Sequence, residues 1–290
     1  NMPGKNGKTV VSSWNEWGPL KHVIVGDATG TMVQAAEIAV QRDWPDQGFP
    51  AGTYGPYPEE MTAQATAQMN DFAKLLESRG IRVDRPTLLD FSQRVQTPDW
   101  VQDSMFGCMP PRDLLLTVGP EILEATMSYR SRWYEYLCYR PLMERYFKED
   151  REFRFEAAPK PRLTERTYQA GWWEAWNAMS EEEKWKRAEA SDWLPAETEP
   201  LWDAADVVRL GKDLFVQKSM VTNDLGIDWL RRHFPEHRVH KVRYREHTPW
   251  HMDSTLIPLR PGLVMINPFR TPLEEAQAEL FRKNDWEVIL

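Results

Sequence analysis

Two residues in the stretch PWHMDST, His251 and Asp253, carry side chains that could move a proton or hold a cation. In an extended segment, residues two positions apart point to the same side, so both would face one place. A histidine and a carboxylate at this spacing could bind a metal ion, perform acid–base chemistry, or simply be polar residues of a strand. The pair alone leaves all three interpretations open.

Acidic residues or a histidine directly precede an apolar strand at three places in the chain. The stretches are PPRD, which ends at Asp113, WDAAD, which contains Asp203 and Asp206, and HMDS. We expect only one of Asp203 and Asp206 to face a shared site, because extended residues three apart point opposite ways. If the stretches surround one axis, the gathered carboxylates would raise one another's pKa. A guanidinium would relieve this repulsion, because its planar N–H groups match carboxylates in a two-pronged geometry.

The elements that must position these residues are predicted to repeat along the chain. Each copy has two strands around a turn, a helix and a further strand. A radial arrangement of such units would bury each sheet against its neighbours in a single α/β domain over residues 1–290. The predicted elements are 113–126, 132–147 and 151–157; 206–217, 223–234 and 237–244; 254–267, 272–284 and 286–290; and a looser copy at 20–26, 63–80 and 81–86.

Residues 158–200 do not fit the repeat. This segment carries five tryptophans and a predicted helix whose first turn has Ser180 and Glu183 as a capping box. A long insert of this kind is typically a lid or a packing arm, and the apolar content favours packing.

Composition excludes several classes of function. The net charge of −8 over 290 residues argues against nucleic-acid binding, which needs a basic surface. The chain has no apolar run of about 18 residues, so no membrane span is predicted. The two cysteines, Cys108 and Cys138, imply no disulfide framework, and we expect a reducing cytoplasmic location.

A non-haem iron site is disfavoured by the distribution of histidines. Such a site needs a second histidine beyond the His-x-Asp pair, and residues 254–290 contain none. His240 shares a predicted strand face with Val242 and is interpreted as half-buried packing. We therefore expect neither a metal nor a cofactor.

Several longer stretches together resemble the arginine:glycine amidinotransferase family, which includes inosamine-phosphate and lysine amidinotransferases. The resemblance extends over nearly the whole chain. Its motifs are SSWNEWGPLKHVIVG, PRD with EILEATMSYRSRWYEYLCYR, APKP, DAADVVRLGKDLFVQ, TNDLGIDWLRRH and HMDSTLIPLRPGLVMINPFR.

The resemblance implies a fold and a reaction. The fold is a five-bladed α/β propeller of ββαβ modules, and relatives are often homodimers. A cysteine thiolate takes the amidino group of L-arginine, ornithine leaves, and an amine then accepts the group. By resemblance, His251 is the general acid and base and Asp203 orients it. Asp113 and Asp253 match the carboxylates that hold the guanidinium, and Arg270 matches the arginine that binds the donor's carboxylate.

The nucleophile of this family lies in the fifth module, and neither cysteine here occupies that motif. Cys108 and Cys138 are interpreted as small buried residues. We expect the fifth module to lie outside residues 1–290, which would be inactive by themselves. Two alternatives stay open: a guanidino-group hydrolase such as an arginine deiminase, and a non-catalytic arginine-binding protein if Leu290 is the true end.

The acceptor amine is not predicted. Glycine, lysine, an amino sugar and other amines are all compatible with the motifs. By resemblance, the loop REHTPW at 245–250 shapes the acceptor site, and residues 48–60 are a second candidate segment.

Overall fold

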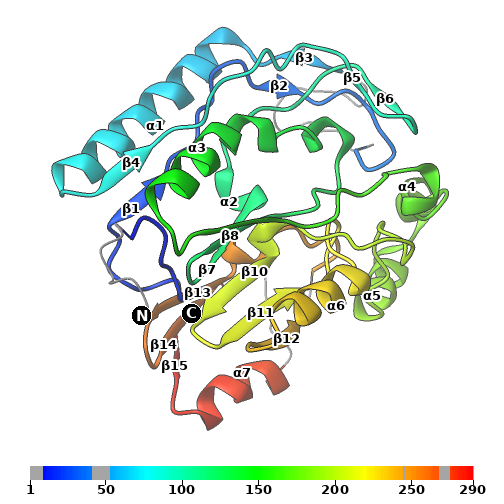
Figure 1. Cartoon of the computed structure of the whole chain (residues 1–290). Helices are drawn as coiled ribbons and strands as arrows, with labels where there is room; N and C mark the ends of the chain where they lie inside the picture. Colours follow the sequence, from blue (N-terminus) through cyan, green and yellow to red (C-terminus); the bar gives the residue numbers. More distant parts are fainter. Residues whose placement is uncertain (1–8, 41–52, 244–245, 268–274, 290) are drawn as a thin grey trace.

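Three consecutive segments of the chain have the same order of elements: a hairpin, a helix, and a strand parallel to the hairpin's second strand (Figure 1). The computed structural model describes residues 9–40, 53–243, 246–267 and 275–289. Three of the four predicted copies are thereby confirmed. Their elements are β7 (Leu115–Val118), β8 (Glu121–Glu124), α3 (Tyr136–Glu149) and β9 (Arg154–Ala157); β10 (Val207–Leu210), β11 (Asp213–Gln217), α6 (Asp224–His233) and β12 (Arg238–Val242); and β13 (Leu256–Arg260), β14 (Leu263–Ile266), α7 (Glu275–Lys283) and β15 (Glu287–Ile289).

The hairpins turn where glycine permits a backbone conformation that other residues avoid. Gly211 has φ of +70° and Gly262 has φ of +79°, in the left-handed region that a side chain disfavours. Helix α6 begins at an expected position, because the Asn223 side chain accepts the backbone N–H of Gly226. Local sequence therefore specifies both the turns and this helix start.

The first copy is only partly formed. Strand β1 (His22–Ile24) pairs in parallel with β4 (Arg82–Asp84), and helix α1 (Glu59–Ser78) connects them. The described residues between them add only the short pair β2 (Met32–Val33) and β3 (Gly55–Pro56), which forms a separate sheet. None of the helices in the described ranges combines the length and apolarity needed to cross a bilayer.

Helix α3 begins later than predicted and contains an internal proline. Residues Arg130–Arg132 form the 3-10 helix η2, and α3 begins only at Tyr136. Pro141 lies inside α3 without ending it. An internal proline costs about 3 kcal/mol, which burial of five side chains against the core offsets. They are Cys138, Tyr139, Leu142, Met143 and Tyr146.

Neighbouring copies share their cores. One apolar cluster joins Leu116 and Leu123 of the first hairpin to Val216 and Leu230 of the next copy. Another joins Phe215 to residues of the last copy, including Phe281 at 5.2 Å between ring centroids. The N-terminal segment 13–17 also crosses the copies: Ser13 pairs with Gly119, and Asn15 pairs with Leu210.

The insert forms most of a second apolar cluster, which also includes Ala39, Trp100 and Met220 from outside it. It contains α4 (Trp172–Ala178) and α5 (Glu181–Glu189), and the predicted capping box of Ser180 and Glu183 is present. Trp172 stacks on Trp176 with ring centroids 5.1 Å apart. Four of the five tryptophans are buried, which supports packing as the use of this segment: Trp172, Trp173, Trp176 and Trp193.

The remaining elements are short. They are β5 (Val95–Gln96) and β6 (Val101–Gln102), which form a hairpin, the helix α2 (Pro111–Leu114), and the 3-10 helices η3 (Glu165–Thr167), η4 (Ala204–Asp206) and η5 (Met252–Ser254).

Candidate active site

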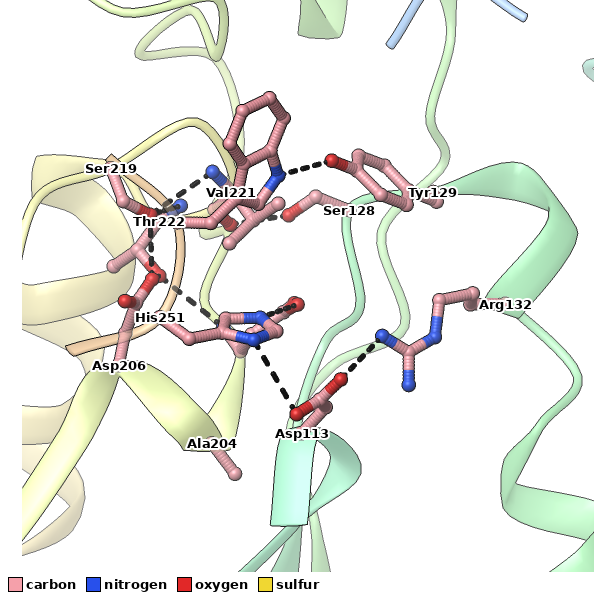
Figure 2. Close-up of polar contacts among 12 residues, drawn as sticks. Asp113, Ser128, Tyr129, Arg132, Ala204, Asp206, Ser219, Val221, Thr222 and His251 are labelled. Atoms are coloured by element: carbon pink, nitrogen blue, oxygen red, sulfur yellow. Dashed lines mark hydrogen bonds and ion pairs between the residues drawn. The ribbon is translucent and has the colours of Figure 1, made fainter. Parts of the chain in front are cut away.

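The polar stretches that precede the first strand of each of the three copies lie close together, as the repeat predicts. Asp113 lies in α2 before β7, Asp203 precedes η4 and β10, and His251 precedes η5 and β13. Helix α2 packs against η4, and η4 packs against η5. Side chains more than a hundred positions apart in the sequence are thereby brought into one cluster (Figure 2).

His251 lies between two carboxylates. Its Nε2 atom is 3.1 Å from Oδ2 of Asp203, and its Nδ1 atom is 3.4 Å from Oδ1 of Asp113. Burial by itself lowers the pKa of His251, but the hydrogen bond to Asp203 and the charges of Asp113, Asp203 and Asp206 raise it to about 9. At neutral pH this imidazole is therefore protonated and can act as an acid.

Asp203 and Asp206 face different ways, as expected. Asp206 is fully buried, and its carboxylate accepts hydrogen bonds from Gln217, Ser219 and Thr222 at 2.5 to 2.6 Å. Burial raises the pKa of Asp206 to about 6 despite these bonds and the charge of His251. The Thr222 hydroxyl also accepts the backbone N–H of Asp203, so Asp206 holds the turn that carries Asp203.

Two carboxylate groups of the cluster have unused hydrogen-bonding capacity. Within the described ranges, no hydrogen bond or ion pair is made by the half-buried Asp253 carboxylate, and none is made by the buried Oδ1 atom of Asp203. Burial raises the pKa of Asp253, with Asp113 and Glu16 adding to the rise and Arg112 and His251 opposing it. Acceptors of this kind suit a ligand rich in N–H donors.

Sequence reasoning missed two charged residues of this cluster, Arg132 and Glu135. The Arg132 guanidinium contacts Asp113 at 2.8 Å and Glu135 at 2.7 and 2.9 Å. Both residues lie within the stretch predicted as one helix, 132–147. Their spacing of three positions, typical of a helical ion pair, was the available signal.

The remaining candidates are either outside the described residues or buried cysteines. Arg270 is outside the described residues, and so are parts of the segments 48–60 and 245–250. Cys108 and Cys138 are free thiols with no exposed surface, and Cys108 contacts the backbone oxygen of Asp27. A search of the described ranges finds no group of three His, Cys, Asp or Glu residues arranged to bind a metal.

The described part of the loop before His251 contacts the insert and Tyr129, the residue before η2. The Trp250 indole donates a hydrogen bond of 2.5 Å to the hydroxyl of Tyr129. The His247 ring lies 3.8 Å from that of Trp185 and 5.9 Å from that of Trp176, measured between centroids. The insert therefore supports the loop that leads into the cluster.

The fold and cluster define an α/β propeller-like protein with a histidine–aspartate pair beside open carboxylates. The solved inosamine-phosphate amidinotransferase of Streptomyces griseus superposes with a TM-score of 0.81 at 35% identity, covering 97% of this chain and 75% of that one. The L-arginine:L-lysine amidinotransferase of Pseudomonas savastanoi pv. phaseolicola is 35% identical, covering 96% of this chain and 73% of that protein. This chain belongs to the amidinotransferase family, and the predicted fold class is confirmed.

Other comparisons set the extent of the similarity. The mitochondrial glycine amidinotransferase of Xenopus tropicalis is 38% identical over 285 residues, which cover 96% of this chain and 65% of that protein. The chain thus spans less than two thirds of that relative's length. No protein-family model matches the chain.

Proposed function

We propose that this chain supplies the donor-binding and acid–base groups of an amidinotransferase that moves the amidino group of L-arginine to an amine and releases ornithine. The observation that carries the proposal is His251 held between Asp203 and Asp113, with the charge of Asp253 acting on both His251 and Asp113. Three carboxylates against one imidazolium leave net negative charge for a guanidinium. Membership of the amidinotransferase family supports the same reaction.

In the first half-reaction, a thiolate attacks the guanidinium carbon of arginine and forms a carbon–sulfur bond. The bond from that carbon to Nδ of the ornithine portion breaks, and His251 gives its proton to the departing nitrogen. In the second half-reaction, the acceptor amine attacks the same carbon, neutral His251 takes its proton, and the carbon–sulfur bond breaks. The thiolate and the protonated histidine are thereby restored.

Asp203 and the other carboxylates have separate tasks in this scheme. Asp203 orients His251 through Nε2 and stabilises its protonated form. Asp113 and Asp253 bind the guanidinium, and Arg270 binds the donor's α-carboxylate. The thiol comes from neither Cys108 nor Cys138, because both are fully buried and no described contact joins either side chain to His251, Asp113 or Asp203.

The proposal extends to the setting of the enzyme. Its substrates are small molecules, it binds neither nucleic acid nor membrane, and the free thiols suit the reducing cytoplasm. A homodimer is the proposed assembly, and light scattering of the purified full-length protein tests it.

The test is an assay of the full-length protein that contains residues 1–290. Arginine labelled in its guanidino group is supplied with a panel of amines, including glycine, lysine and an amino sugar. We expect ornithine and a labelled guanidino product, with losses of about 10²- to 10⁴-fold in His251→Ala and Asp203→Asn. Citrulline and ammonia as products would show a hydrolase instead, and near-parental transfer by either variant would contradict the assigned roles.

A further inference from the structure

The guanidinium of Arg132 joins the site carboxylate Asp113 to Glu135 (Figure 2 shows Arg132 and Asp113). Arg132 and Glu135 are almost completely buried, with exposed fractions of 5% and 3%. Nε and Nη2 of Arg132 donate to the two oxygens of Glu135, while Nη1 donates to Oδ2 of Asp113. The rigid fork of an arginine side chain sets the direction of all three bonds.

This arrangement gives the two oxygens of Asp113 different tasks. Oδ2 is held by Arg132 at 2.8 Å, and Oδ1 is turned toward Nδ1 of His251 at 3.4 Å. Rotation of the carboxylate would break the bond to Arg132 and leave a buried charge without its partner, which is costly. Asp113 therefore has a defined orientation before any ligand binds.

Arg132 is itself held in place by a second buried group. Glu37 accepts the backbone N–H groups of Arg130 and Ser131 at 2.8 and 3.3 Å, and the Ser131 hydroxyl at 3.2 Å. These contacts anchor η2, of which Arg132 is the last residue. The Phe106 ring lies 5.3 Å from the Arg132 guanidinium carbon and covers it.

A purely structural ion pair would not need the contact to Asp113. Glu135 already supplies two acceptors to Arg132, and a buried pair of this kind adds little net stability. The third bond reaches into the cluster that holds His251. Its target is a carboxylate that faces the reacting histidine.

We propose that Arg132 is a positioning residue that fixes Asp113 with a single oxygen directed at His251 and the donor guanidinium. This inference rests on the proposed amidino transfer. In this arrangement Asp113 accepts hydrogen bonds from the guanidinium with one oxygen, and Asp253 accepts them with two.

The test removes the clamp, Arg132, together with its buried partner Glu135, so that Glu135 is not left as an unpaired buried charge. Arg132→Met combined with Glu135→Leu replaces the ion pair by apolar groups, a change that buried pairs often tolerate. Arg132→Lys keeps the charge and loses the fork. The control is Arg140→Met with Glu124→Leu, which removes another arginine–glutamate pair at 3.2 Å that has no contact with Asp113.

The first readout is the pKa of His251, measured by NMR in the resting full-length protein. The charges of the Asp113, Asp203, Asp206 and Asp253 carboxylates all act on His251, and that of Asp113 contributes to its raised pKa of about 9. We expect this pKa to fall in the Met/Leu variant, because Asp113 turns away from Nδ1, and to stay in place in the control. The paired substitution removes one positive and one negative charge, so direct charge effects largely cancel.

The second readout is kinetic. We expect kcat/KM for arginine to fall roughly 10- to 100-fold in the Met/Leu variant, with a smaller loss in Arg132→Lys, because a displaced carboxylate misaligns the donor. An unchanged His251 pKa in the folded Met/Leu variant would overturn the inference, whatever the activity. If the parent protein transfers no amidino group but the pKa falls, the clamp stands and the proposed function fails.

Discussion

The imidazole of His251 lies 3.1 Å from the carboxylate of Asp203, although the two residues are 48 positions apart in the sequence. Its other nitrogen faces Asp113, so both ring nitrogens have an acidic neighbour. Burial opposes protonation of this ring, but these two carboxylates and the charge of Asp206 outweigh burial and raise the pKa of His251 to about 9. The histidine is thus charged before a donor arrives.

The pH dependence of the first half-reaction should report this histidine. We expect kcat/KM for arginine to decline above a pH of about 9, where free His251 loses the proton that the departing amine needs. In Asp203→Asn the decline should move to lower pH, because a hydrogen bond and a charge that raise the pKa are lost. Initial rates measured across a pH series give both values.

The control for this experiment is another aspartate–histidine pair. Asp213 contacts His240 at 2.7 Å on strands outside the cluster. Asp213→Asn should leave the alkaline decline where the parent has it. The assignment is wrong if Asp203→Asn and the parent decline at the same pH.

The stability of the protein should also depend on His251. A histidine whose pKa is raised on folding contributes stability that is fully present below about 6.5 and is lost as the pH rises through about 9. The contribution at low pH is about 3 kcal/mol by this linkage. Urea unfolding without arginine, at pH 6 and pH 9.5, should show the parent losing more stability than His251→Gln. Equal losses in the two proteins would contradict the raised pKa.

Neither described cysteine should be needed for transfer. Cys108→Ala and Cys138→Ala should each lower the free energy of unfolding by about 1–2 kcal/mol, because each leaves a small cavity in the core. Amidino transfer by the folded double variant should stay within about twofold of the parent. Inactivation by iodoacetamide should persist in it. A folded double variant without transfer would show that one of these thiols is the nucleophile.

The insert should behave as a packing unit. Trp172 is 2% exposed and stacks on Trp176, so Trp172→Ala should lower the free energy of unfolding by about 3–5 kcal/mol. Phe147→Ala is the matched control, because Phe147 is 63% exposed and its loss should cost less than about 0.5 kcal/mol. Thermal or urea unfolding gives the comparison. Unchanged stability together with an altered kcat would instead indicate a lid.

Much of this protein is determined by its sequence alone. Apolar periodicity and backbone preference, which act over a few residues, determine the hairpins. They also determine the turn at Gly211 and the cap at Asn223 that precedes α6. The repeated order of elements follows from the same local signals. The family motifs place His251 and Asp203 in named roles, but those roles stay predictions until the variants are measured.

Tertiary structure decided how the charged groups face one another. The clamp of Arg132 on Asp113, the inward direction of Asp206, and the position of Pro141 inside α3 all depend on contacts between distant segments. Distances between modules also set the pKa of His251, which the hydrogen bond to Asp203 and the charges of Asp113, Asp203 and Asp206 raise against the effect of burial. Local sequence patterns do not specify such distances. The carboxylates reach the His251 ring only because whole modules pack against one another.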